Sequence, residues 1–270
     1  MISRLPAILL CAAALAAPPI PTRASAHRGD SKNAPENTLP AIESAARKGA
    51  HQIEFDVKFT SDRRLVLMHD ATVNRTTSGK GRVADLTFEQ IRSLDAGSWF
   101  SPRFAGVRVP TFEEALAAVP PGIVCNVHLS DTPGLAGAVA RVIAAMGRAA
   151  DCVLACTPAQ AAEARRIAPD IGFCNMAGQR TDNLAYARDS IAAKAGFIQL
   201  RGGLDNVAEA VDLLHRAGIK VNYFSAQDPA SIQRLIDARV DYILTDDLDL
   251  LLAILARHGV ETFRPAPRRQ

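Results

Sequence analysis

The 270-residue sequence predicts an α/β protein, a TIM-type (β/α)8 barrel with a small inserted subdomain. Three observations lead to this fold class. From about residue 111 onward, short apolar runs alternate regularly with helix-like stretches, which is the pattern of a parallel sheet. When one hairpin is set aside, the expected strands number eight, as a TIM-type barrel requires. No glycine-rich dinucleotide loop follows any strand, which argues against the alternative, a doubly wound open sheet.

The N-terminus is typical of a secretory signal peptide. Arg4 precedes an apolar stretch over residues 5–17, which is too short for a membrane span with such flanks. We expect a signal peptide over 1–16 with cleavage near Ala16. Cleavage after Ala26 also fits the small-residue rule, but it would remove a predicted strand. The mature protein is therefore expected to be periplasmic or secreted, without stable membrane insertion.

The first barrel elements follow this segment, in a barrel domain expected over residues 22–258. A strand over 23–27 ends at His27-Arg28-Gly29, and a loop ending at Thr38 precedes a helix over 39–48. Gly49 stops that helix, because glycine readily adopts the left-handed conformation of a helix end. The next strand covers residues 51–56.

Two acids one residue apart, Glu54 and Asp56, lie on that strand and point the same way because strand side chains alternate. A second apolar run, 65–68, follows after only a few polar residues. A parallel neighbour would need a longer crossover, so the two runs should form an antiparallel hairpin. We expect Asp56 to lie opposite His69 in this hairpin.

Residues 71–110 are turn-rich and should form the inserted subdomain, with one helix near 87–94. Its Trp99 either shields a substrate or packs within the insert together with Phe100. The regular part of the chain then supplies the other expected helices, over 111–119, 134–146, 158–168, 183–193, 206–217, 229–238 and 248–257. Its expected strands cover 123–129, 152–156, 171–175, 196–200, 220–224 and 241–245.

Composition excludes some classes of partner. The net charge is only +3 and no long basic run exists, so nucleic acid is not an expected partner. The basic tail over 259–270 is short. Four cysteines would remain after export, and each lies in or beside an apolar run, so we expect buried free thiols: Cys125, Cys152, Cys156 and Cys174. Nothing in the sequence indicates an oligomeric state.

Glu54 and Asp56 are the strongest candidates for chemistry. Two carboxylates facing one lumen repel each other unless a cation compensates, and a hard divalent ion such as Ca²⁺ or Mg²⁺ would do so. The alternative is a structural pair neutralised by arginines. His27 and His69 would flank the acids, one removing a proton and the other protonating a leaving oxygen. Arg28 would bind a phosphate, unless it forms a salt bridge with Glu36 or Asp30.

At these residues the chain resembles the glycerophosphodiester phosphodiesterase family of the phospholipase-C-like TIM-barrel superfamily. The matching pieces are His27-Arg28-Gly29, Pro35-Glu36-Asn37-Thr38, Glu54-x-Asp56-Val57, His69-Asp70, Arg75-Thr76-Thr77, Gly79-x-Gly81, Leu94-Asp95-x-Gly97 and Val109-Pro110-Thr111-Phe112-Glu113-Glu114. The resemblance implies hydrolysis of a small-molecule glycerophosphodiester to glycerol 3-phosphate and an alcohol. It implies acid and base roles for His27 and His69, metal ligation by Glu54 and Asp56, and a substrate pocket that includes Arg28, Glu36, Trp99 and Phe224.

The chain departs from the family pattern on the strand over 123–129. His128 and Ser130 stand where the family has a Glu-x-Lys pair, and Phe224-Ser225 stands in place of Trp-Thr. An imidazole at position 128 would join the metal ligands and favour Zn²⁺ or Mn²⁺ over Ca²⁺ or Mg²⁺. Two alternatives to hydrolysis stay open: a barrel that binds a phosphodiester without turnover, and a phospholipid-headgroup lyase that stops at a cyclic phosphate.

Overall fold

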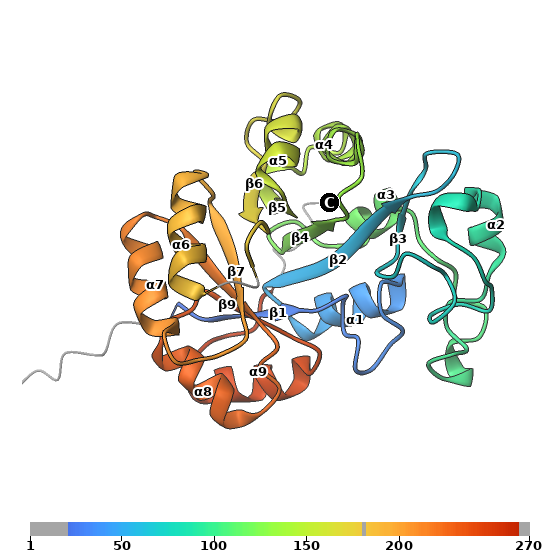
Figure 1. Ribbon diagram of the computed structural model, residues 1–270. Helices are drawn as coiled ribbons and strands as arrows, with labels where there is room; N and C mark the ends of the chain where they lie inside the picture. Colours follow the sequence, from blue (N-terminus) through green and yellow to red (C-terminus); the bar gives the residue numbers. More distant parts are fainter. Residues whose placement is uncertain (1–20, 180–181, 265–270) are drawn as a thin grey trace, which may run out of the picture.

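Eight parallel strands close into a barrel in the computed structural model, which describes residues 21–179 and 182–264. The barrel closes because β1 pairs with both β9 and β2 (Figure 1). The predicted TIM-barrel fold is therefore confirmed. Its strands are β1 (Arg23–Ala26), β2 (Gln52–Phe59), β4 (Val124–Leu129), β5 (Cys152–Cys156), β6 (Gly172–Asn175), β7 (Phe197–Arg201), β8 (Lys220–Phe224) and β9 (Tyr242–Thr245).

Helices surround the barrel and bury its outer face. They are α1 (Leu39–Lys48), α3 (Phe112–Ala118), α4 (Leu135–Ala145), α5 (Pro158–Arg165), α6 (Asn183–Ala192), α7 (Val207–Arg216), α8 (Pro229–Asp237) and α9 (Leu248–Arg257). Alternation along β2 shows how the core forms: Ile53, Phe55 and Val57 belong to the main apolar core, while Glu54 and Asp56 line the cavity at the barrel mouth. Apolar burial thus holds the acids in place.

The hairpin after β2 forms, but its register differs by one residue from our expectation. Strand β3 (Leu65–Leu67) is antiparallel to β2, with Val57 opposite Leu67. The turn is one residue shorter than assumed, because Arg63 adopts a left-handed φ of 63° and Thr60 N–H donates to the Arg64 carbonyl. The Met68 N–H consequently donates to the Asp56 carbonyl, and the expected pairing of Asp56 with His69 is wrong.

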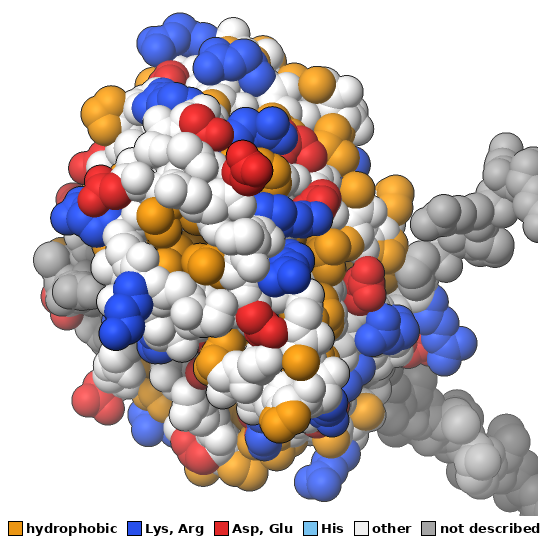
Figure 2. Space-filling view, turned by 90° about the vertical axis from the view of Figure 1, so that its right-hand side faces the viewer, with side chains coloured by type: hydrophobic (Ala, Val, Ile, Leu, Met, Phe, Trp, Pro, Cys, Tyr) orange, Lys and Arg blue, Asp and Glu red, His pale blue; other side chains and the backbone are white. Residues whose placement is uncertain are grey.

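The segment over residues 71–110 has a small apolar core of its own. It contains the short helix α2 (Phe88–Ser93), which begins with a capping box between Thr87 and Gln90, and two 3-10 turns, Val83–Asp85 and Pro102–Phe104. Figure 2 shows the face that carries this segment, where acidic and basic side chains are interspersed. Two side chains of this core come from β3 and the residue that follows it. The buried residues of the core are Val66, Met68, Val73, Val83, Ile91, Ala96 and Val109.

The structure bears on several other expectations. The four cysteines of the described residues, Cys125, Cys152, Cys156 and Cys174, are free and buried, as predicted. In the described part of the chain, no helix is long and apolar enough to cross a membrane. The predicted signal peptide lies outside the described residues, but Ala26 ends β1, so cleavage after it would remove a strand that closes the barrel.

Candidate active site

A cavity of about 310 Å³ opens at the carboxyl ends of the strands. This is the end where functional residues of TIM barrels collect. Side chains from β2, which carries the two acids, and from β7 and β8 on the other side of the barrel line this cavity. The lining residues are His27, Arg28, Glu54, Asp56, His69, His128, Met176, Gln179, Gln199, Arg201, Phe224 and Leu244. The two predicted acid–base histidines therefore share one cavity with the predicted metal ligands.

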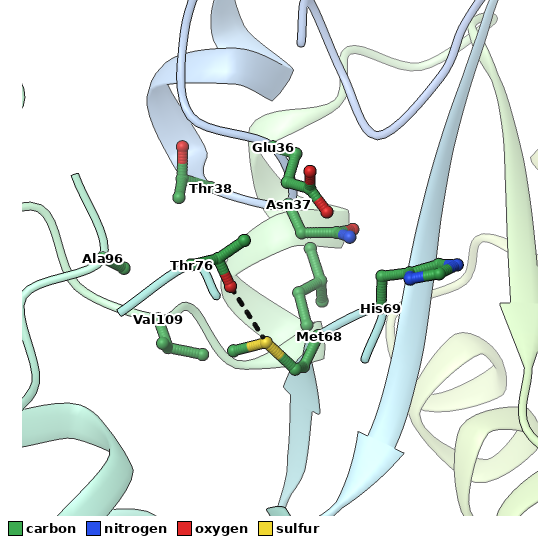
Figure 3. Close-up of a pocket in the computed structure, with 9 residues that line it drawn as sticks. Glu36, Asn37, Thr38, Met68, His69, Thr76, Ala96 and Val109 are labelled. Atoms are coloured by element: carbon green, nitrogen blue, oxygen red, sulfur yellow. Dashed lines mark hydrogen bonds between the residues drawn. The ribbon is translucent and has the colours of Figure 1, made fainter. Parts of the chain in front are cut away.

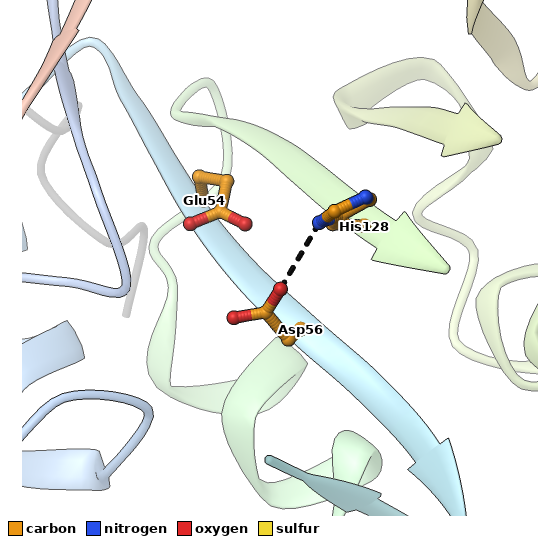
Figure 4. A group of neighbouring side chains, drawn as sticks. All are labelled: Glu54, Asp56 and His128. Atoms are coloured by element: carbon orange, nitrogen blue, oxygen red, sulfur yellow. Dashed lines mark hydrogen bonds and ion pairs between the residues drawn. The ribbon is translucent and has the colours of Figure 1, made fainter. Parts of the chain in front are cut away.

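Glu54, Asp56 and His128 form a compact cluster, with one potential ligand atom from each residue lying within 4.8 Å of the others. Figure 4 shows the acids projecting from β2 and the imidazole from β4, which pairs with β2 so that Asp56 and His128 are neighbours. His128 Nδ1 lies 3.0 Å from Asp56 Oδ1. Register between two parallel strands, rather than closeness in the sequence, thus brings the imidazole to the acids.

The pKa values of Glu54 and Asp56 shift in opposite directions. Burial and the adjacent charge of Asp56 raise the pKa of Glu54 above its usual range. Burial would also raise the pKa of Asp56, but the hydrogen bond from His128, with the charges of Arg28 and His69, outweighs it and lowers that pKa. The two carboxyl groups therefore repel each other when both are ionised, and a nearby cation would reduce this repulsion.

The donor set suits a divalent metal ion. Two carboxylates and an imidazole are common ligands of divalent cations. The Oδ1 atom of Asn126 is also buried without a hydrogen-bond partner among the described residues. Asn126 lies on β4 opposite Glu54. One cation does contact the pair, since Arg28 Nε lies 3.5 Å from Asp56 Oδ2, yet this nitrogen forms no hydrogen bond. The arginine-neutralised alternative is therefore only partly realised, and the cluster is a candidate metal site.

His27 is held by a carboxylate that the sequence analysis did not single out. Its Nδ1–H donates to Asp246 Oδ1 at 2.6 Å, and Asp246 follows β9 directly. The hydrogen bond from His27 lowers the pKa of Asp246, which keeps this group ionised and able only to accept. The contact orients the ring so that Nε2 faces Glu54, with Nε2 3.9 Å from Oε2.

His69 has a similar arrangement built from local sequence. Its Nδ1–H donates to Oδ1 of the next residue, Asp70, at 2.7 Å. Arg75 braces that carboxylate through its Nε and Nη2, and its guanidinium also donates to Glu36. These hydrogen bonds lower the pKa of Asp70. In both histidines, Nδ1 is therefore the ring nitrogen that bonds to a carboxylate.

Arg28 is engaged by acids rather than open to solvent. Its Nη1 donates to Glu36 Oε1 at 2.8 Å, which is the salt bridge we considered as the alternative to phosphate binding. Its backbone N–H donates to Glu54 Oε2 at 2.9 Å, with Arg28 in a left-handed conformation at φ 57°. Burial would raise the pKa of Glu36, but bonds from Arg75 and the charge of Arg28 lower it. Arg28 and Glu36 therefore act first as a scaffold for the acids.

The remaining predicted residues are divided between the cavity and the insert. Phe224 lines the cavity and lies against His27, with ring centroids 4.6 Å apart. Trp99 does not line the cavity; its ring contacts Phe100 and its Nε1–H donates to the Ala96 carbonyl. Ser130 follows the end of β4, where its hydroxyl pairs with Thr132, so strand alternation no longer directs it into the lumen. The substrate role of Trp99 stays a prediction.

A second, much smaller pocket lies behind His69. Figure 3 shows it between Glu36 and Asn37 on one side and the insert residues on the other, with Thr76 Oγ1 donating to Met68 Sδ at 3.3 Å. Its volume of about 10 Å³ is room for about one water molecule. The cavity that contains the acids and both histidines is therefore the candidate substrate site.

Comparison with known proteins identifies the family to which this chain belongs. Two histidines beside a candidate metal cluster are compatible with a hydrolase-type site. Residues 27–250 match the model of the glycerophosphoryl diester phosphodiesterase family. The chain is 31% identical over 243 residues to the glycerophosphodiester phosphodiesterase of Caldanaerobacter subterraneus subsp. tengcongensis, covering 87% of this chain and 98% of that protein. The chain therefore belongs to this family, whose members are phosphoric diester hydrolases.

Other relatives and structures agree. Human glycerophosphodiester phosphodiesterase 1 is 55% identical over 96 residues, which are 35% of this chain and 29% of the human protein. A glycerophosphodiester phosphodiesterase from Agrobacterium tumefaciens superposes with a TM-score of 0.75 at 27% identity, over 86% of this chain and 99% of that one. An Oleispira antarctica phosphodiesterase, solved with the product sn-glycerol-3-phosphate, has a TM-score of 0.75 at 21% identity over 87% of this chain and 96% of that one, which shows the shared fold.

Proposed function

We propose that this protein is an exported, metal-dependent enzyme that hydrolyses glycerophosphodiesters to glycerol 3-phosphate and an alcohol. The observation that carries the proposal is the shared cavity, where the Glu54–Asp56–His128 cluster faces His27 and His69. Family membership supports the reaction class. The product named for the Oleispira antarctica structure supports glycerol 3-phosphate as the product here.

Glu54, Asp56 and His128 would hold the metal ion. When bound, the ion supplies positive charge that offsets the charge developing on the phosphoryl oxygens. The chain's own part in the reaction is proton transfer by the two histidines. Because each donates Nδ1–H to a carboxylate, each presents Nε2 to the cavity, the neutral ring as a base and the protonated ring as an acid.

A chelator experiment tests metal dependence. The purified mature protein is assayed on glycerophosphocholine before and after chelation, and single metals are then added back. We expect chelation to abolish release of glycerol 3-phosphate and a divalent metal to restore it. Full activity in the chelated protein, with no metal detected by elemental analysis, would contradict the proposal. Accumulation of a cyclic phosphate would instead identify a lyase.

The imidazole in the cluster supports a transition metal such as Zn²⁺ or Mn²⁺, because imidazole is a poor ligand for Ca²⁺ and Mg²⁺. The His128→Glu variant restores a third carboxylate. We expect it to bind Ca²⁺ or Mg²⁺ more tightly and Zn²⁺ more weakly by calorimetry. An unchanged metal preference would show that position 128 does not contact the ion.

Export is supported by the signal-like N-terminus alone. N-terminal sequencing of the protein from the cell envelope or medium tests it, with a mature start near residue 17 as the expected result. A start at Met1 with the protein retained in the cytoplasm would contradict export.

A further inference from the structure

The cavity has two walls of different character. One wall, formed by β2 and β4, carries Glu54, Asp56 and His128. The opposite wall, formed by β7 and β8, contributes Gln199, Arg201 and Phe224, with Gln179 beside them. A phosphodiester is an anion, so the acidic wall repels it unless cations in the cavity compensate.

Two arginines line the cavity, and they differ in how far their charge is already used. Arg28 is largely buried and forms ion pairs with Glu36 and Asp56. Arg201 is exposed to the cavity, and within the residues 21–179 and 182–264 no hydrogen bond or ion pair to its side chain is found. Of the two arginines that line the cavity, Arg201 is therefore the one whose positive charge is not paired with an acid among the described residues.

An aromatic ring holds Arg201 beside the reacting groups. The Arg201 guanidinium carbon lies 5.8 Å from the centroid of the Phe224 ring, and this ring lies against His27. A guanidinium within about 6 Å of an aromatic centroid is attracted to the ring without using its N–H donors in hydrogen bonds. The Phe224 ring thus lies next to both His27 and Arg201.

The need for this cation follows from what the chain lacks elsewhere. Ser130 follows β4, but its hydroxyl pairs with Thr132 and the residue does not line the cavity. Lys58 lies on β2 but is not among the residues that line the cavity, so no lysine of the acidic wall reaches the cavity lining. A cation from the opposite wall can attract an anion because both walls face one small cavity.

We propose that Arg201 binds the phosphate group of the substrate from the wall that lies opposite the acids. This proposal rests on the proposed function and deepens it. Arg201 would lower the KM for diesters and hold the phosphate of the product, through charge-assisted hydrogen bonds to non-bridging oxygens. It does not itself transfer a proton, because arginine stays protonated.

The test compares Arg201→Met and Arg201→Lys with the wild type. Methionine keeps an apolar stem against Phe224 but removes the charge, and lysine restores the charge. Arg216→Met is the matched control, because Arg216 is an exposed arginine near the end of α7, outside the cavity lining. Circular dichroism and thermal melting confirm that each variant is folded.

We expect Arg201→Met to raise KM and the inhibition constant of glycerol 3-phosphate about tenfold or more, since a charged hydrogen bond is lost. Arg201→Lys should recover part of this loss, and Arg216→Met should match the wild type. Calorimetry with inorganic phosphate on the metal-loaded protein should show the same loss of affinity. Unchanged KM and phosphate affinity in Arg201→Met would overturn the proposal.

Two further outcomes separate the possibilities. A loss confined to glycerophosphoserine, with glycerophosphocholine and inorganic phosphate unaffected, would show that Arg201 binds an anionic headgroup and would overturn its assignment to the phosphate. If the metal-loaded wild type hydrolyses no glycerophosphodiester, the proposed function fails. The phosphate-binding comparison still decides the role of Arg201 in that case, because it needs no turnover.

Discussion

The two candidate acid–base histidines use the same hydrogen bond in different surroundings. The His27 side chain is only 12% exposed, and its partner Asp246 comes from the far end of the barrel sequence. The His69 side chain is 41% exposed, and its partner is the next residue, which Arg75 braces. Burial of the His27 ring strengthens the first pair although Asp246 itself is 45% exposed. In contrast, the exposure of His69 and the neighbouring Arg75 weaken the electrostatic effect of the second pair. The difference indicates that Asp246 matters more to His27 than Asp70 does to His69.

The largest expected effect is loss of a histidine itself. His27→Ala and His69→Ala should each lower kcat by roughly 10²- to 10⁴-fold, because proton transfer by a positioned side chain contributes about that much. Steady-state kinetics measure the change, and His258→Ala, at the exposed end of α9, is the control. If either cavity variant retains a near-wild-type rate, the two-histidine assignment is wrong.

The second-largest expected effect on kcat distinguishes Asp246, the partner of His27, from Asp70, the partner of His69. Asp246→Asn should lower kcat about 10- to 100-fold, the usual cost of losing a partner that orients a functional histidine. Asp70→Asn should cost less than about tenfold, because the exposed His69 ring is partly stabilised by water. The pH profile of kcat should shift in Asp246→Asn, and Asp246→Glu should restore part of the rate. A larger loss in Asp70→Asn would reverse our ranking of the two pairs.

The smallest expected effect is on stability. Hydrogen bonds from Arg75 and His69 hold the pKa of Asp70 below its ordinary value of 3.8. A depressed folded-state pKa stabilises the protein above the unfolded value, and that stability is lost as the pH falls further. Asp70→Asn should therefore melt about 2–4 °C below the wild type at pH 7, and the gap should narrow below about pH 4. A gap that stays constant on acidification would exclude this origin.

Much of the fold could be predicted because its signals are local. The alternation of apolar and amphipathic stretches indicated the barrel, and the one-residue spacing of Glu54 and Asp56 placed both acids on one face of β2. His27 and His128 could be placed because each lies at or near the carboxyl end of a strand. The hairpin register was missed because one left-handed residue, Arg63, shortened the turn.

The functional partners that sequence reasoning missed depend on contacts between distant segments. Asp246 lies 219 residues after His27. No spacing rule could pair this residue with His27. Arg75 was visible only as part of a matching motif, and nothing local marked Arg201 as an unpaired cation.

The sequence by itself therefore determined which side chains face the barrel lumen, since strand periodicity depends on the backbone alone. Only the tertiary structure decided which of those side chains meet, which charges are already neutralised and which remain free. Those properties depend on how the barrel closes and on how strands far apart in the chain align, and both arise from packing across the whole molecule.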